Sequence, residues 1–145
     1  MTVSDPFYSQ LSLLAPFDAT AGSSTFTDSS PFAHTFSTSG SPVISSTHSK
    51  SGNALYLNGS GSYLTAGSSP AFALGAGDFA MGVWLWPETQ TSSYPVVFER
   101  TGSWGAGEWQ LMAGHAEHPG VYSLYIYDQT VRDCIVGTAA IAVGA

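Results

Sequence analysis

The sequence predicts an all-β protein in which short antiparallel strands form a two-sheet sandwich or a barrel. Helical periodicity is nearly absent, because glycine or proline interrupts almost every stretch of the chain. Short runs of apolar and β-favouring residues recur instead. Residues that favour tight turns separate these runs, at Asn58-Gly59, 75–77, 105–107 and Pro119-Gly120. Many short strands joined by such turns are typical of sandwiches and barrels.

The same signals place the individual strands. We expect them at 11–17, 24–27, 33–37, 41–45, 54–58, 62–66, 78–86, 95–100, 108–113, 121–127 and 134–143. The arms 54–58 and 62–66 alternate around Asn58-Gly59, a pair that can supply the positive φ angles of a tight turn. These two arms are therefore predicted to pair with each other as a hairpin.

Composition limits the classes of partner. The chain has 145 residues, enough for one domain with a sizeable core. Charged residues make up 9% of the sequence, and the net charge is −7. The fixed cations are Lys50, Arg100 and Arg132, too few to follow a phosphate backbone or an anionic membrane surface. We therefore expect no nucleic-acid partner and no membrane insertion.

Cysteine usage and the N-terminal residues bear on the protein's location. Cys134 is the single cysteine, so an intramolecular disulfide is excluded, and its apolar neighbours favour a buried thiol. Residues 1–10 show neither the basic nor the apolar region of a secretion signal. If the protein works outside a cell, we expect it to leave by lysis, by dedicated export or as part of a particle.

The order of four stretches carries a family resemblance. SLLAPFD (12–18) is followed by TFTDSS (25–30), SGNALYLNGSGSYLTAG (51–67) and ALGAGDFAMGVWLWPE (73–88). This order resembles the laminin-G-like jelly-roll family within the concanavalin A-like lectin and glucanase fold. The resemblance covers residues 11–145 and leaves 1–10 as an N-terminal arm. It implies an all-β, two-sheet antiparallel jelly-roll sandwich.

A finer resemblance concerns function. DPFYSQLSLLAPFD (5–18) and SPVISSTHSKSGNALYLNGSGSYL (41–64) are similar to versions of the family found in structural proteins of tailed bacteriophages. This implies a virion protein, as a tail fibre, tail appendage or capsid decoration. Its expected partners are other virion proteins and further copies of itself. The alternative is a receptor-recognition domain that binds a host surface glycan.

Catalysis is not expected. Glucanases of this fold carry a Glu-x-Asp-x-(x)-Glu signature that places two carboxylates on one face of a strand. Here the glutamates fall in separate turns or strands, at Glu88, Glu99, Glu108 and Glu117. The pair His115 and His118 is flanked by Gly114 and Pro119-Gly120, so we expect a solvated loop there rather than a metal site.

Aromatic side chains are the candidates for recognition. Phe79, Met81, Val83 and Leu85 alternate along 78–86, and we expect them to point into the core between the two sheets. Other aromatic residues would then be available to stack on a sugar or on a neighbouring subunit. The alternative is that a loop or a further strand of the same chain covers them, which we expect for Trp84 and leave open for Trp86. The candidate binding residues are Trp84, Trp86, Trp104, Tyr125 and Tyr127.

No cofactor is expected apart from a structural calcium ion, which some members of the family hold. Asp18 and Asp28 are the candidate ligands, because both follow early strand segments where the family gathers such ligands. The family usually has aspartate at the positions of Asn58 and Ser62, which weakens a site near that turn.

The C-terminal stretch GTAAIAVGA (137–145) is similar to a family strand that further strands normally follow. We therefore expect a sandwich that lacks its last strands, with an open or partner-filled strand position beside 137–144. Either a longer natural chain or a strand from a neighbouring chain would complete the sheet.

Overall fold

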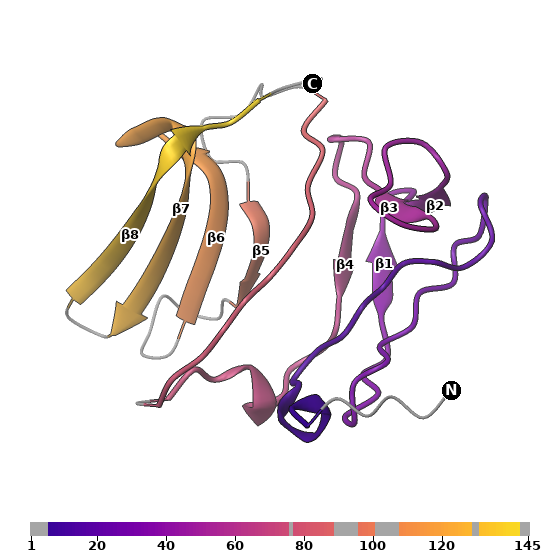
Figure 1. The fold of residues 1–145 in the computed structure, drawn as a ribbon, viewed down its shortest axis with the longest axis horizontal. Helices are drawn as coiled ribbons and strands as arrows, with labels where there is room; N and C mark the ends of the chain where they lie inside the picture. The colour runs from indigo at the N-terminus through magenta and orange to yellow at the C-terminus, as the bar shows by residue number, and fades with distance from the viewer. Residues whose placement is uncertain (1–5, 76, 89–95, 101–107, 129–130, 143–145) are drawn as a thin grey trace. The chain divides into compact units, whose positions relative to one another are not determined.

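The computed structural model describes residues 6–75, 77–88, 96–100, 108–128 and 131–142. In this part of the chain the fold is all-β, and every sheet is antiparallel (Figure 1). The described helices are two three-residue 3-10 turns, η1 (Tyr8–Gln10) and η2 (Pro70–Phe72). The predicted all-β antiparallel class is confirmed. The chain divides into two compact units, Met1–Ala71 and Phe72–Ala145.

The first unit is organised by one long, bent hairpin. Its strands are β1 (Ser37–Ser39), β2 (Val43–Ser45), β3 (Ala54–Tyr56) and β4 (Tyr63–Thr65). β2 pairs with β3, and β1 pairs with β4. The two sheets are therefore successive parts of the same pair of arms, with residues 46–53 at the tip.

The predicted short hairpin between 54–58 and 62–66 is wrong. The two segments are strands, but each pairs with the opposite arm of the long hairpin. Between the pairs Val43–Tyr56 and Ser39–Tyr63, one arm holds residues 40–42 and the other holds 57–62. Asn58 and its glycine neighbours thus form the longer side of a break in the arms, not a tight turn.

Side-chain hydrogen bonds hold this break. Asn58 Oδ1 accepts hydrogen bonds from the backbone N–H of Ser60 at 2.9 Å and from the Ser62 hydroxyl at 2.8 Å. The backbone N–H of Ser41 in the other arm donates to Ser62 Oγ at 3.2 Å. Asn58 therefore closes its own loop locally, a common behaviour of asparagine that competes with the strand ladder.

The segments before β1 contain less strand than predicted. The structure assigns no strand to 11–17, and only an isolated bridge between Thr27 and Thr35 in the region of the predicted strands 24–27 and 33–37. Nearby, Ile44 accepts a backbone hydrogen bond from Gly22 and donates one to Ser23. Ile44 is buried and supplies a core residue of this unit.

The second unit contains one four-stranded sheet. Its strands are β5 (Val96–Arg100), β6 (Glu108–His115), β7 (His118–Asp128) and β8 (Val131–Ala140). They pair in chain order, β5-β6-β7-β8, as an antiparallel meander (Figure 1). These strands overlap the predicted ones, but β7 and β8 each begin three residues earlier than predicted. The predicted turn at Pro119-Gly120 is wrong, because these residues lie in β7 and the turn is at 116–117.

The segment 78–86 differs from its prediction. The structure assigns no strand to it, and it runs as a long trace from η2 toward β5 (Figure 1). Phe79, Val83 and Leu85 are exposed, and Met81 is half-buried. The expectation that these four side chains fill an inter-sheet core is therefore wrong for the described structure. Without a paired strand beside it, the segment has no sheet face to bury.

None of the helices in the described part of the chain is both long enough and apolar enough to cross a membrane.

Gly40 tests the break in the long hairpin. Gly40 has φ +64°, and an added Cβ would lie 2.8 Å from Ser62 Oγ and 2.9 Å from the Gly61 carbonyl oxygen. Gly40→Ala should lower the free energy of unfolding by about 2 kcal/mol, since strain and overlap both act. The control is Gly59→Ala, where φ is +70° and nothing lies within 4 Å of the added atom. Urea unfolding of both variants measures the difference. Equal losses would contradict the close approach of the two arms.

Candidate functional site

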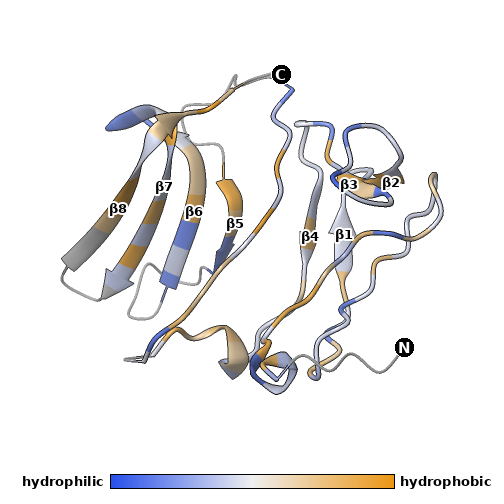
Figure 2. Cartoon of the chain, viewed as in Figure 1, coloured by the Kyte–Doolittle hydropathy of each residue, from blue (hydrophilic) through white to orange (hydrophobic). Residues whose placement is uncertain are grey.

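The two predicted tryptophans of 78–86 lie on the molecular surface. Trp84 is 77% exposed, and Trp86 is also exposed. The exposed apolar residues of 79–86 include both odd-numbered and even-numbered positions. They are Phe79, Val83, Trp84, Leu85 and Trp86. We call residues 79–86 the apolar segment; Figure 2 shows its hydropathy along the trace that precedes β5. Trp104, the third predicted tryptophan, lies outside the described residues.

The two predicted tyrosines lie in β7, apart in sequence from the apolar segment. Tyr125 is 1% exposed, and its ring centroid lies 4.8 Å from that of His115. Tyr127 is half-buried, and its hydroxyl donates to Gln110 Oε1 at 3.3 Å. The structure therefore gives these tyrosines packing and hydrogen-bonding contacts within the sheet.

The register of the sheet gathers a set of polar side chains that the sequence reasoning missed. Glu99 of β5 lies opposite Gln110 of β6, which lies opposite Tyr125 of β7. Because opposite residues and residues two apart share a face, this polar face also includes further side chains. Its members are Glu99, Glu108, Gln110, Ser123, Tyr125 and Tyr127. In the sequence, the polar residues Glu108 and Gln110, two positions apart in a predicted strand, could have indicated this polar face.

Part of this polar face is deeply buried. Glu108 is 5% exposed, and Gln110 and Ser123 are also buried. Gln110 Nε2 donates to Glu99 Oε2 at 2.7 Å, so the amide is bonded at both ends. Within the described structure, Glu108 Oε2 and Ser123 Oγ are buried atoms with no hydrogen-bond partner. A buried carboxylate oxygen of this kind is an acceptor for a donor group, at a free-energy cost while unsatisfied.

Glu99 and Glu108 were expected in separate strands or turns. They do lie on different strands, but the register places them diagonally on one face, a separation of about 7–8 Å between backbone positions. Glu99 is exposed and bonded to the Gln110 amide, whereas Glu108 is buried. The two carboxyl groups thus occupy different environments.

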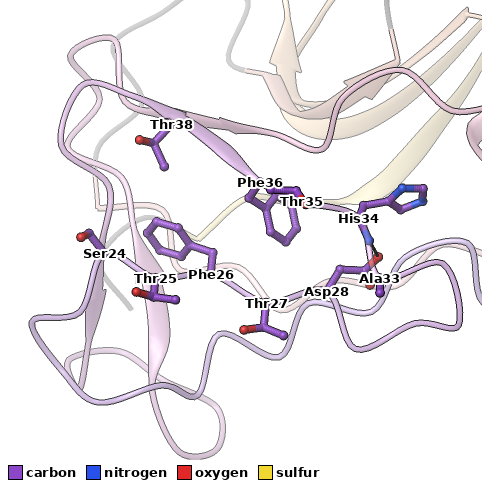
Figure 3. Close-up of a pocket in the computed structure, with 10 residues that line it drawn as sticks. All are labelled: Ser24, Thr25, Phe26, Thr27, Asp28, Ala33, His34, Thr35, Phe36 and Thr38. Carbon is purple, nitrogen blue, oxygen red and sulfur yellow. Dashed lines mark hydrogen bonds between the residues drawn. The ribbon is translucent and has the colours of Figure 1, made fainter.

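Asp28, one of the two predicted calcium ligands, is a buried hydrogen-bond acceptor. The side chain is 5% exposed. Its Oδ1 accepts from the backbone N–H of Leu14 and of Ser30, each at 2.9 Å. Its Oδ2 accepts from the Ser30 hydroxyl and from the backbone N–H of His34, each at 2.8 Å (Figure 3). One carboxylate therefore ties three segments of the first unit together.

These bonds set the protonation of Asp28. Burial raises the pKa of its carboxyl group, but the backbone N–H groups of Leu14, Ser30 and His34, with the Ser30 hydroxyl, outweigh this effect. The net result is a pKa below the ordinary value of 3.8. Four accepted bonds use the roughly four lone-pair sites of a carboxylate. A calcium ion would have to replace some of them.

Asp18, the other predicted ligand, is exposed. In the part of the chain that the structure describes, no group of three or more His, Cys, Asp or Glu side chains is placed to hold a metal ion. The calcium site therefore stays a prediction, and the described geometry gives Asp28 a structural role.

His115 and His118 close the β6–β7 hairpin rather than lying in a longer loop. They face each other across the two-residue turn 116–117. His115 Nδ1 accepts from the backbone N–H of Glu117 at 3.1 Å and lies 3.7 Å from its carboxylate. These contacts give His115 a structural role at the β6–β7 turn.

A pocket of about 440 Å³ lies in the first unit (Figure 3). Its lining comes from 24–28 and 33–38, the two segments joined by the Thr27–Thr35 bridge. The Phe26 and Phe36 rings lie between these segments, and each has its centroid 6.4 Å from that of Phe17. Residues with hydroxyl groups line much of the remainder, together with Asp28, Ala33 and His34, so the pocket combines apolar, neutral polar and ionisable residues.

Comparison of the chain with known protein families, curated proteins and solved structures gives no match.

Asp28 allows a direct test of its structural role. Asp28→Asn should lower the free energy of unfolding by about 2–3 kcal/mol, because an amide nitrogen would face hydrogen-bond donors in a buried position. The same change at exposed Asp18 should stay within about 0.5 kcal/mol. Urea unfolding at neutral pH measures both. Similar losses at the two positions would contradict the assignment.

The lowered pKa of Asp28 also predicts a pH dependence. Near pH 3.8 the unfolded chain holds more protons on this group than the folded chain does. Its stabilisation should be complete above pH 3.8 and should disappear as the pH falls through the lower folded-state pKa. The stability difference between the wild type and Asp28→Asn should therefore shrink below that pH. A difference that stayed constant on acidification would show that folding does not lower the pKa of Asp28.

Proposed function

We propose that this chain is a non-enzymatic structural module of a virion, and that the apolar segment is the surface through which it packs on other subunits. The observation that carries the proposal is the exposure of five large apolar side chains among residues 79–86. Exposed patches of this kind mark interaction sites in soluble proteins. Tryptophan in particular is enriched at the centres of protein interfaces.

The composition supports an apolar interface. Residues 79–86 contain no charged side chain, and only 9% of the whole chain is charged. Depletion of charge is the compositional signal of an interface core. The assignment to a virion, as a tail fibre, an appendage or a decoration protein, rests on the ordered resemblance of the sequence to phage structural proteins.

The jelly-roll architecture is part of the same proposal. The inner pair β2–β3 lies within the outer pair β1–β4 along the chain, an arrangement expected of a long hairpin folded over into a jelly roll. The antiparallel sheet β5-β6-β7-β8 can form one layer of a two-sheet sandwich, although its consecutive pairing is that of a meander and not of a Greek key. Glu99, held by the amide of Gln110, is consistent with a structural rather than a catalytic sheet.

The apolar segment predicts self-association that depends on tryptophan. Replacing both Trp84 and Trp86 with serine should weaken association at least tenfold, since interface tryptophans commonly contribute about 2 kcal/mol or more. Sedimentation velocity across a concentration series measures this. Tyr63→Ser is the control, because Tyr63 is an exposed aromatic of the first unit. Detection of the chain by mass spectrometry in purified particles tests the virion assignment separately.

A chain that stays monomeric at all concentrations would contradict assembly through copies of itself. If its tryptophan fluorescence then responded to soluble glycans, the result would favour the receptor-recognition alternative.

A further inference from the structure

β8, the last strand of the second unit, is an edge of the four-stranded sheet in the described part of the chain. The strand order β5-β6-β7-β8 leaves β8 paired with a described strand on one side only. Its register with β7 is regular over Val131–Val136, and a bulge follows between the pairs Ser123–Val136 and Val121–Ala140. From 134 to 142 the sequence contains no charged residue and no proline. Natural proteins usually protect edges with such residues, because an open edge recruits further strands.

Side chains on this edge are accessible as well. Ile135 is 62% exposed, and Val136 is also exposed. Exposed β-branched residues on an edge strand favour the addition of another strand, since they pack well on a pleated surface.

β5, the opposite edge of the sheet, is less suited to this role. It has five residues, and these include Glu99 and Arg100. Its register with β6 shifts between Val96 and Phe98. β8 also has two charged residues, Arg132 and Asp133, at its start and a register shift of its own, so the features that separate the edges are the greater length of β8 and its uncharged stretch from 134 to 140.

The apolar segment has the properties of a strand outside any sheet. Its sequence, Phe-Ala-Met-Gly-Val-Trp-Leu-Trp, is rich in aromatic and aliphatic residues that favour strands, and proline follows it at 87. The structure assigns no strand to it, and both of its alternating sets include exposed side chains. The same unit thus holds an edge that can accept a strand and a segment that is suited to supply one.

We propose that the apolar segment of one copy of this chain adds to β8 of a second copy as an antiparallel strand. This inference rests on the proposed assembly function and names its partner as another copy of the same chain. Main-chain hydrogen bonds supply the attraction in this kind of strand addition, and alternating side chains set the register. An antiparallel addition continues the pattern of the existing sheet. In the alternative, contact between apolar side chains alone would bury the tryptophans but would not order the backbone of the apolar segment as a strand.

Cys134 makes the pairing measurable, because the chain's single cysteine lies in β8. We would change residues 79 to 86 to cysteine one at a time in a chain that also carries Cys134→Ser. Each variant is mixed with wild-type chain and oxidised, so that a disulfide between the two positions joins different copies. Side chains that face each other across paired strands lie close enough for a disulfide, whereas those on opposite faces do not.

The expected result is a mixed disulfide dimer at the position of the apolar segment that lies opposite Cys134, at least fivefold above the positions on either side of it. Equal cross-linking at all positions, or none, together with persistent association would overturn strand pairing and leave the proposed assembly function standing. Monomers at every concentration, with no cross-link, would overturn both. The two failures are therefore distinguishable.

A pair of edge variants gives an independent readout. Ile135→Lys places a charge on β8 and should weaken association at least tenfold. Val96→Lys places the same charge at a similarly accessible residue of β5 and should leave association within twofold. Circular dichroism confirms that both variants fold. Loss of association in Val96→Lys alone would assign the accepting edge to β5 and overturn the proposal.

Discussion

Backbone hydrogen bonding between antiparallel strands is the constraint on which both units depend. Each strand carries N–H and C=O groups that must be paired when they leave water. With so few charged side chains, the chain satisfies its remaining polar groups with neutral donors and acceptors. Asp28 is an instructive exception, since its one negative charge is distributed over four hydrogen bonds within a single unit. The ladders fix the strands, and bonds of this type fix the segments between them.

The sequence predicted strand positions better than strand partners. Runs of strand-favouring residues located β5 to β8 to within about three residues. The turn residues Pro119-Gly120 misplaced the turn before β7, since they lie within that strand. The same reasoning failed at Asn58-Gly59, where a sequence that suits a tight turn forms a loop in the middle of a longer hairpin. Local preference cannot reveal that each arm has a better partner across the tip, since the competing pairing is non-local.

The candidate site, like the fold, was predicted from the sequence only in part. Trp84 and Trp86 are exposed, although Trp84 was expected to be covered by another part of the chain. The core role given to Phe79, Val83 and Leu85 required a strand that the described structure lacks. The polar face around Gln110 could not be recognised, because it is assembled from three strands whose relative register is a tertiary property. Its buried Glu108 carries a free-energy cost that an apolar residue would avoid. Because of this cost, a buried polar group indicates a specific role more strongly than an exposed apolar residue does.

The bent hairpin of the first unit has a consequence for the order of folding. The inner pair β2–β3 closes only the short tip 46–53, so its loop-closure entropy is small. Once that pair has formed, β1 and β4 are already held near each other, and the break at 40–42 and 57–62 is all that separates them from contact. Folding can therefore proceed outward from the tip as a zipper. Crossing the mismatched break costs loop-closure entropy, because three residues on one side have to be matched with six on the other.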